Sequence, residues 1–170
     1  MAAKILLTGA TGYIGSHTWL ALLAAGYEVV GVDDFSNSSP AVLPRLAALS
    51  GTAPLFECAD VGDPAALEAV FNRHEIAAVV HFAAFKAVGE STQKPLDYYR
   101  NNVGGLLNVC ETMAAHGCRR IVFSSSATVY GAPESLPIRE DAPLSTTNPY
   151  GATKLIGENI LRDLGAADAR

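Results

Sequence analysis

Cysteine, histidine and charged residues are scarce in this sequence, and each shortage argues against a class of protein. Three cysteines occur among 170 residues, an odd number without CxxC spacing, which is a poor framework for disulfides. We therefore expect Cys58, Cys110 and Cys118 to be reduced thiols. The four histidines lack the spacing of metal ligands, so we expect no metal site.

Charge and long apolar runs are also limited. Charged residues make up 17% of the chain against 49% hydrophobic residues, and the net charge is −5. The basic residues form no patch, which argues against binding to nucleic acid or an anionic membrane. The start, MAAKILLTGATGYIG, lacks a cationic segment followed by a long apolar core, so we expect neither a signal peptide nor a membrane span. These features predict a cytoplasmic globular protein.

Short apolar, β-branched runs alternate with longer stretches of helical spacing along the chain. Strands are predicted at residues 4–8, 28–32, 55–58, 77–82 and 120–125. Helices are predicted at residues 14–25, 40–50, 64–74, 95–116 and 149–164. Apolar strands separated by helices predict an α/β fold, a doubly wound parallel sheet of order 3-2-1-4-5. Ligand is then expected in one crevice at the carboxyl ends of the strands, beside residues 9–15, 33, 60, 83–86 and 124–126.

Three glycines follow the first predicted strand and open the first predicted helix. Gly9, Gly12 and Gly15 have GxxGxxG spacing, which differs from the GxGxxG of classical dehydrogenases. Glycine permits a tight turn, a close approach of backbone to a pyrophosphate, and close packing of helix on strand. The N–H groups at the helix N-terminus then hold the phosphates. Alone the spacing fits any turn, but between a strand and a helix it predicts a dinucleotide site.

An acidic pair ends the second predicted strand. The Asp33 carboxylate is placed to accept both ribose hydroxyls of an adenosine, and it repels a 2′-phosphate. Asp34 adds a second negative charge, so the expected cofactor is NAD and not NADP.

Asp60 and Val61, after the third strand, have two interpretations that the sequence leaves open. Asp60 accepts from the adenine amino group while Val61 packs on the ring, or Asp60 belongs to the turn before the Asp63 helix cap.

A tyrosine and a lysine lie four residues apart at the start of the last predicted helix. Tyr150 and Lys154 share a helix face, so the ammonium can approach the phenol. A free phenol, with a pKa of about 10, is a poor base at neutral pH, and lowering that pKa by roughly 3 units takes about 4 kcal/mol. A lysine and a cationic nicotinamide can supply this in a partly dry cleft. Of the three serines that end the fifth strand, Ser126 is predicted to bond the reacting oxygen.

Six segments carry a resemblance to a known family. They are TGATGYIGSH, VDDFSNSS, HFAAFKAVGES, YYRNNVGG, SSSATVYG and NPYGATK. In this order the chain resembles the UDP-glucose 4-epimerases, also called UDP-galactose 4-epimerases, of the extended short-chain dehydrogenase/reductase family. That resemblance implies a Rossmann-like NAD-binding domain over residues 1–170 that is incomplete at its C-terminal end. Since family members are about twice as long, later strands and the substrate domain are expected to be absent, and these residues alone to be inactive.

The resemblance also implies which residues meet cofactor and substrate. The implied NAD-binding residues are Gly9, Gly12, Tyr13, Ile14, Gly15, Asp33, Asp34, Phe35, Ser36, Asn37, Ser38, Asp60, Val61, Phe82, Ala83, Ala84, Phe85, Lys86, Asn101, Ser126, Tyr150 and Lys154. Ser126, Tyr150 and Lys154 are implied as the catalytic trio, with Tyr150 as the base and Ser126 and Tyr150 on the substrate. The family usually has Asn in place of Asp34 and Leu in place of Phe85, departures that concern cofactor affinity.

The implied reaction interconverts UDP-glucose and UDP-galactose through a 4-keto sugar, whose C4 is oxidised and then reduced from the opposite face. A 4,6-dehydratase shares the first step, but typically carries an Asp-Glu pair where this chain has Ala127 and Thr128. A non-catalytic NAD-binding module is the second alternative, and it does not require a phenol beside an ammonium.

Helices 95–116 and 149–164 carry more apolar residues than one sheet contact needs. The related epimerases use these helices in a dimer, so we expect a homodimer over the alternative that both only cover the sheet.

Overall fold

The computed structural model describes residues 4–168, so Met1, Ala2 and Ala3 of the N-terminal segment lie outside the described part. The chain divides into two compact units. The first, called the sheet unit, consists of the residues up to Ala83 together with Leu107–Ser124. The second, called the helical unit, consists of Ala84–Leu106 and the residues from Ser125 onward.

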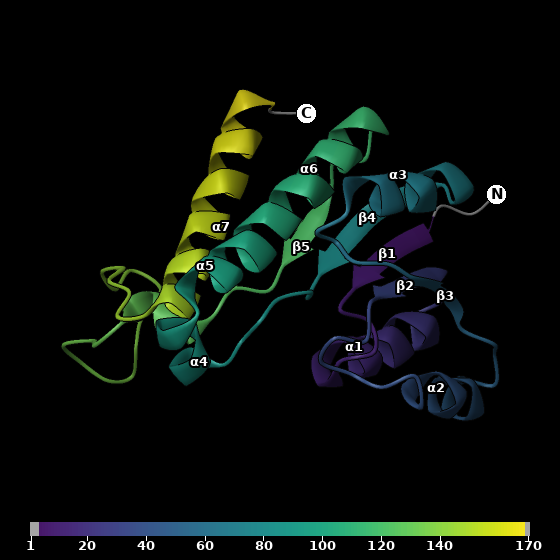
Figure 1. Ribbon diagram of the computed structural model, residues 1–170, viewed down its shortest axis with the longest axis horizontal. Helices are drawn as coiled ribbons and strands as arrows, with labels where there is room; N and C mark the ends of the chain where they lie inside the picture. Colours follow the sequence, from purple (N-terminus) through teal and green to yellow (C-terminus); the bar gives the residue numbers. More distant parts are fainter. Residues whose placement is uncertain (1–3, 169–170) are drawn as a thin grey trace. The chain divides into compact units, whose positions relative to one another are not determined.

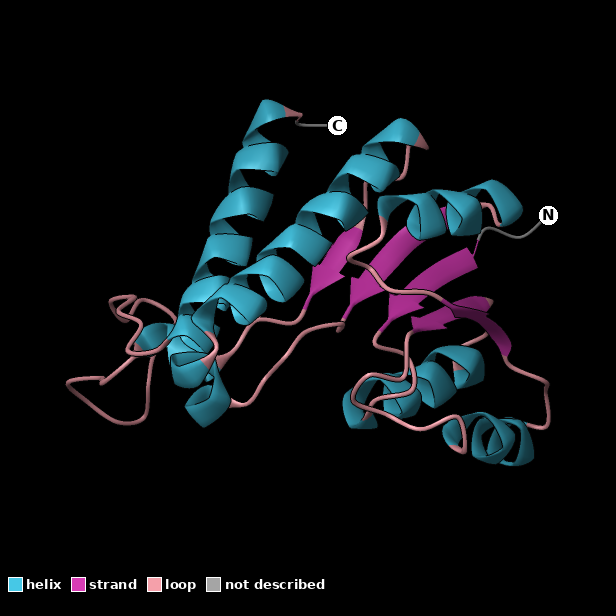
Figure 2. Ribbon diagram, in the orientation of Figure 1, coloured by secondary structure: helices cyan, strands magenta, loops and turns pink. Residues whose placement is uncertain are grey.

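Five parallel strands form one sheet in the sheet unit, in the order β3-β2-β1-β4-β5 (Figure 2). They are β1 (Lys4–Thr8), β2 (Val29–Asp33), β3 (Leu55–Cys58), β4 (Ile76–His81) and β5 (Ile121–Phe123). The predicted doubly wound sheet and its order 3-2-1-4-5 are therefore confirmed. The predicted fifth strand, residues 120–125, is too long, because only Ile121–Phe123 pair with β4.

Helices cover both faces of this sheet, which explains why its strands are apolar on both sides. The helices are α1 (Tyr13–Ala24), α2 (Val42–Ser50), α3 (Pro64–Arg73) and α6 (Gly105–Ala115), the last of which belongs to the sheet unit from Leu107 onward. In Figure 1, α1 and α2 lie on the face opposite α3. Adjacent residues of β1 point to opposite faces. Leu7 joins the core with Trp19 of α1, whereas Leu6 joins the core with Leu67 of α3.

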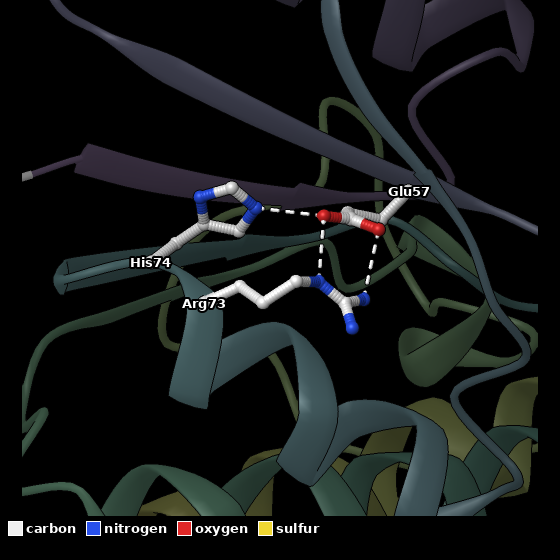
Figure 3. Close-up of polar contacts among 3 residues, drawn as sticks. All are labelled: Glu57, Arg73 and His74. Atoms are coloured by element: carbon white, nitrogen blue, oxygen red, sulfur yellow. Dashed lines mark hydrogen bonds and ion pairs between the residues drawn. The ribbon is translucent and has the colours of Figure 1, made fainter.

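A polar cluster fixes the edge strand β3 to the end of α3 (Figure 3). The Arg73 guanidinium donates to both Glu57 carboxylate oxygens, at 3.1 and 2.8 Å, and His74 Nε2 lies 2.8 Å from Glu57 Oε1. The hydrogen bond from Arg73 is the main cause that lowers the pKa of Glu57. At the other end of α3, the Asp63 carboxylate accepts from the N–H groups of Ala65 and Ala66, as the sequence predicted. Both ends of α3 are therefore held by side chains.

The helical unit contains short helices followed by one long helix. Its elements are α4 (Val88–Gln93), α5 (Pro95–Tyr98), the π-helix η1 (Tyr99–Gly104), the 3₁₀ helix η2 (Ala127–Tyr130) and α7 (Pro149–Ala167). The predicted helix over residues 95–116 is helical from Pro95 to Ala115, but it is not a single α-helix, because Tyr99–Gly104 form the π-helix η1 between α5 and α6. The apolar spacing of this segment gives no sign of the wider π-turn in η1. The side chain of Asn102, in η1, bonds to Phe85 and to Thr153, which are distant in the sequence. Over residues 4–168, none of the helices combines the length and apolarity needed to cross a membrane.

Candidate functional site

The glycine turn of the sheet unit packs so closely that two of its positions have no room for a side chain. Gly9 has φ +65°, and a Cβ atom there would lie 2.7 Å from the backbone nitrogen of Ala83. A Cβ atom on Gly15 would lie 2.1 Å from the carbonyl oxygen of Gly9. Side chains are therefore excluded at both positions, because the turn packs directly on the end of β4 and on the first turn of α1.

The N-terminus of α1 has no side-chain cap. Gly12 is its N-cap and has no side chain to bond the first N–H groups. The side chains of Tyr13 and Ile14, which follow Gly12, are exposed. Positive helix ends with accessible N–H groups bind anions. The phosphate site at Gly9–Gly15 stays a prediction, and this helix end is its physical argument.

Asp33 organises the loop after β2. Its carboxylate accepts from the N–H of Thr11 at 3.0 Å and from the N–H of Phe35 at 2.9 Å, and also from the Ser38 hydroxyl at 2.9 Å. Ser38 and Thr11 hydroxyls lie 2.7 Å apart. The same aspartate that was predicted to hold a ribose therefore connects the glycine turn to residues 34–38. Phe35 adopts φ +61°, an unusual conformation for a residue with a side chain, and its ring contacts Phe56.

Five other predicted cofactor positions lie in this loop and in the turn after β3. Asp34 accepts from the N–H and hydroxyl of Ser36, and both residues are exposed, as is Asn37. Asp60 is exposed and accepts from the N–H of Gly62 at 2.7 Å. That bond fits the turn interpretation and leaves the carboxylate accessible. Val61 is 4% exposed and packs in the core between the sheet and α3.

The segment after β4 crosses from one unit to the other. Phe82 and Ala83 pack on the two cores of the sheet unit. In the helical unit, Asn102 accepts from the N–H of Phe85 at 2.8 Å and donates to its carbonyl oxygen at 2.9 Å. Ala84 is half-buried, Lys86 is exposed, and Asn101 donates to Asn102 at 2.9 Å. Asn102 thus holds the backbone of the predicted cofactor segment.

A tyrosine with a fixed protonation state supports the same segment. The buried Tyr98 accepts from the N–H of Ala87 at 3.0 Å and donates to the Glu90 carboxylate at 2.9 Å. Burial, followed by this bond to Glu90, raises the pKa of Tyr98. Tyr98 therefore stays a neutral phenol, and the negative charge of an ionised Tyr150 contributes in the same direction. Tyr98 is thus held by hydrogen bonds to both Ala87 and Glu90.

Tyr150 and Lys154 lie on the first two turns of α7. Asn148 caps this helix by accepting from the N–H of Gly151 at 2.8 Å, and Pro149 occupies its first turn. Lys154 is buried, and burial lowers its pKa to about 8. Thr153 donates to the carbonyl oxygen of Tyr150 at 2.7 Å and accepts from Asn102 at 3.0 Å. The predicted pair thus lies on one face of a helix that Asn102 ties to the segment at Phe85.

Ser126 is the N-cap of η2, and its bonds leave it prepared to donate. Its Oγ accepts from the N–H of Thr128 at 3.2 Å and from the Thr128 hydroxyl at 2.9 Å. A serine hydroxyl has two lone pairs and one hydrogen, so these two bonds use the lone pairs and leave the hydrogen for a ligand oxygen. Ser125, the neighbouring serine, instead donates to Glu158.

Asn102, Thr153 and Glu158 support the predicted residues but were not singled out from the sequence. Each is adjacent or at helical spacing to a predicted residue: Asn102 to Asn101, Thr153 to Lys154, and Glu158 four residues after Lys154. That adjacency was the available signal. Within residues 4–168, no three His, Cys, Asp or Glu side chains are grouped so as to hold a metal ion.

The sequence and fold both match known proteins. The profile of the NAD dependent epimerase/dehydratase family matches residues 5–169. A UDP-glucose 4-epimerase of Bacillus subtilis is 56% identical over 96% of this chain and 48% of its own length. A crystal structure of UDP-glucose 4-epimerase from Bifidobacterium longum in complex with NAD⁺ and UDP superposes with a TM-score of 0.95 at 47% identity, covering 98% of this chain and 50% of that one.

A second solved structure agrees with the first. The UDP-glucose-4-epimerase of Stenotrophomonas maltophila, with bound NAD and formylated UDP-arabinopyranose, has a TM-score of 0.94 at 44% identity and covers 97% of this chain and 49% of that one. The chain spans about half the length of the curated relatives it matches. The resemblance identified from the six sequence segments is therefore confirmed, and the chain belongs to the NAD dependent epimerase/dehydratase family.

Proposed function

We propose that this protein takes part in the NAD-dependent interconversion of UDP-glucose and UDP-galactose. The observation that carries the proposal is the arrangement on α7, where Tyr150 is followed one turn later by the buried Lys154. Pure cofactor binding does not require a phenol on the same helix face as an ammonium. Relatives with the name UDP-glucose 4-epimerase, which match nearly the whole chain, support the same proposal.

The proposed NAD contacts begin at the glycine turn. Gly9 and Gly15 lack the Cβ atoms that would fill the turn, and the N-terminus of α1, which has no side-chain cap, suits the pyrophosphate. Asp33 and Asp34 suit the ribose hydroxyls and disfavour a 2′-phosphate. When bound, NAD supplies a hydride acceptor for C4 of the sugar and returns that hydride to the opposite face. We propose residues 1–170 as the NAD-binding part of the protein on these grounds.

Residues of the helical unit would transfer the proton of the sugar 4-hydroxyl. Ionised Tyr150 accepts the proton of the sugar 4-hydroxyl, and the positive charge of Lys154 stabilises the phenolate. Ser126, whose hydroxyl hydrogen is not used in its two bonds to Thr128, donates to the same sugar oxygen. When the 4-keto sugar is reduced, Tyr150 returns the proton. No net oxidation results, so the reaction is an isomerisation.

The test is the identity of the product. Incubation of a form of the protein that includes the substrate domain with UDP-galactose and NAD should give UDP-glucose, detected by a dehydrogenase specific for UDP-glucose. A 4,6-dehydratase would instead give a 4-keto-6-deoxy sugar with strong absorbance in alkali. A non-catalytic NAD-binding module would bind NAD, measured by fluorescence titration, and form neither product. Either of the last two results would overturn the proposed reaction.

We further propose a homodimer in the cytoplasm with a role in galactose metabolism. Exposed apolar side chains on the two helices of the dimer prediction support it, with Leu107 on α6 and Leu164 on α7 as examples. Cys58, Cys110 and Cys118 are free thiols, which fits this location because disulfides form mainly in oxidising compartments. A monomeric mass in light scattering at micromolar concentration would contradict the dimer.

A further inference from the structure

The segment after β5 is tied to α7 by a contact that the proposed mechanism does not use. Ser125 Oγ donates a hydrogen bond to Glu158 Oε1, and both residues are half-buried. The two residues are separated by 33 positions in the sequence. Glu158 lies one turn beyond Lys154 and two turns beyond Tyr150, so the three side chains follow one face of α7. This contact therefore involves the catalytic face of the helix.

A second contact holds the other end of the same segment. Thr128 of η2 lies so close to α7 that a Cβ atom on Gly151 would be 3.0 Å from the Thr128 carbonyl oxygen and 3.2 Å from its Oγ1. Ser126 lies between Ser125 and Thr128 and bonds to Thr128 through its hydroxyl. Ser126 is thus held beside α7 from both sides, through the bond of Ser125 to Glu158 and through the packing of Thr128 against Gly151.

We propose that Glu158 is a positioning residue that acts through Ser125 to hold the Ser126 hydroxyl in place for the reacting oxygen. This inference rests on the proposed function, because it concerns the same proton-transfer step. The hydroxyl must stay within hydrogen-bond reach of the sugar oxygen as charge develops there. Misplacement of a catalytic group by about 1 Å can cost on the order of 100-fold in rate. Glu158 touches neither cofactor nor substrate in this scheme.

A different role for Glu158 would be electrostatic, through its charge one turn from Lys154. The two roles are separated by replacing the carboxylate with an amide. Glu158→Gln removes the charge but keeps an oxygen that accepts from Ser125. Glu158→Leu removes both. If Glu158 acts by position, the Gln variant keeps kcat within about threefold of the parent, whereas the Leu variant loses about 30- to 100-fold in kcat.

The experiment measures kcat and KM for UDP-galactose, NAD affinity by fluorescence titration, and unfolding by urea for each variant, made in a form of the protein that includes the substrate domain. For Glu158→Leu we expect KM and NAD affinity within about threefold of the parent, since the lost step is chemical. Asp163→Leu, an exposed acidic residue on the same helix, is the matched control and should leave kcat unchanged. Ser125→Ala removes the donor from the other side, and we expect a kcat loss of about 10-fold. It serves as the second variant if Glu158→Leu does not fold.

A double-mutant cycle gives the decisive result. If Glu158 acts through Ser126, the variant with both Glu158→Leu and Ser126→Ala loses little more kcat than Ser126→Ala alone. A purely structural role predicts that the two losses multiply, and that result would overturn the proposal. A Gln variant as slow as the Leu variant, or a Leu variant within threefold of the parent, would also overturn it. Failure of the proposed function is recognised separately, by a parent without epimerase turnover or a Tyr150→Phe variant that retains it.

Discussion

Lys154 lies one helical turn beyond Tyr150 on α7, and only 4% of Lys154 is exposed. Burial of the ammonium lowers the pKa of Lys154 to about 8, so the side chain is still mostly charged at pH 7. A charge in a partly dry environment is screened less than one in water, and it stabilises a neighbouring anion more strongly. This relationship is the basis for assigning Tyr150 as the base.

The first prediction concerns the phenol itself. Tyr150→Phe keeps the ring but removes the oxygen that takes the proton, so kcat should fall by roughly 10²–10⁴-fold while NAD binding is retained. Turnover of UDP-galactose and a fluorescence titration with NAD measure the two effects. Tyr27→Phe, which removes an exposed phenol from the sheet unit, is the control. Activity of Tyr150→Phe within threefold of the parent would remove Tyr150 from the role of base.

The second prediction concerns stability against pH in the cofactor-free protein. The pKa of Lys154 is about 8 in the folded chain, below the ordinary value of 10.5, so the unfolded chain binds more protons between these values. The free energy of unfolding should therefore rise with pH from 8 to 10.5 relative to that of Lys154→Met, by about 3 kcal/mol at most. Urea unfolding of both proteins across this range measures the difference. Equal slopes for parent and variant would contradict the lowered pKa.

Cofactor choice is the third prediction. Asp33 is held in place by its bonds to Thr11, Phe35 and Ser38, and Asp34 adds a second carboxylate beside it. A 2′-phosphate would meet both charges, so NADP⁺ should bind at least about 100-fold more weakly than NAD⁺, which corresponds to about 2.7 kcal/mol. A competition titration measures the ratio. Equal affinities would show that Asp33 does not lie at the ribose.

The fourth prediction compares two glycines. Gly15→Ala places a methyl group where the Gly9 carbonyl oxygen lies 2.1 Å away, so the turn must shift. We expect loss of NAD binding and a decrease of about 1–3 kcal/mol in the free energy of unfolding. Gly165→Ala, on the exposed side of α7 with open space around it, should instead stabilise the helix by about 0.5–1 kcal/mol. NAD titration and urea unfolding of both variants check this contrast. Unchanged NAD binding by Gly15→Ala would contradict the proposed phosphate site.

The sequence by itself determined the sheet and most of its helices. Leu6, Leu7, Val30 and Val79 belong to short apolar runs, and such runs separated by helical spacing have few other solutions than a covered parallel sheet. Local chemistry also settled the Asp63 cap, because it depends on neighbouring residues only. For the same reason, the four-residue spacing of Tyr150 and Lys154 is sufficient to place both side chains on one face of a helix.

Only the tertiary structure decided what supports these residues. Asn102 bonds Phe85, 17 positions away, and Thr153, 51 positions away, and these bonds accompany the π-helix that interrupts the predicted long helix. Asp33 bonds Thr11 across 22 positions, and Ser125 bonds Glu158 across 33. Polar side chains such as these show no periodicity, and their partners are chosen by whichever backbone or side-chain group the folded chain brings within reach. The burial that lowers the pKa of Lys154 has the same origin, since desolvation depends on all the atoms packed around the ammonium and not on its neighbours in sequence.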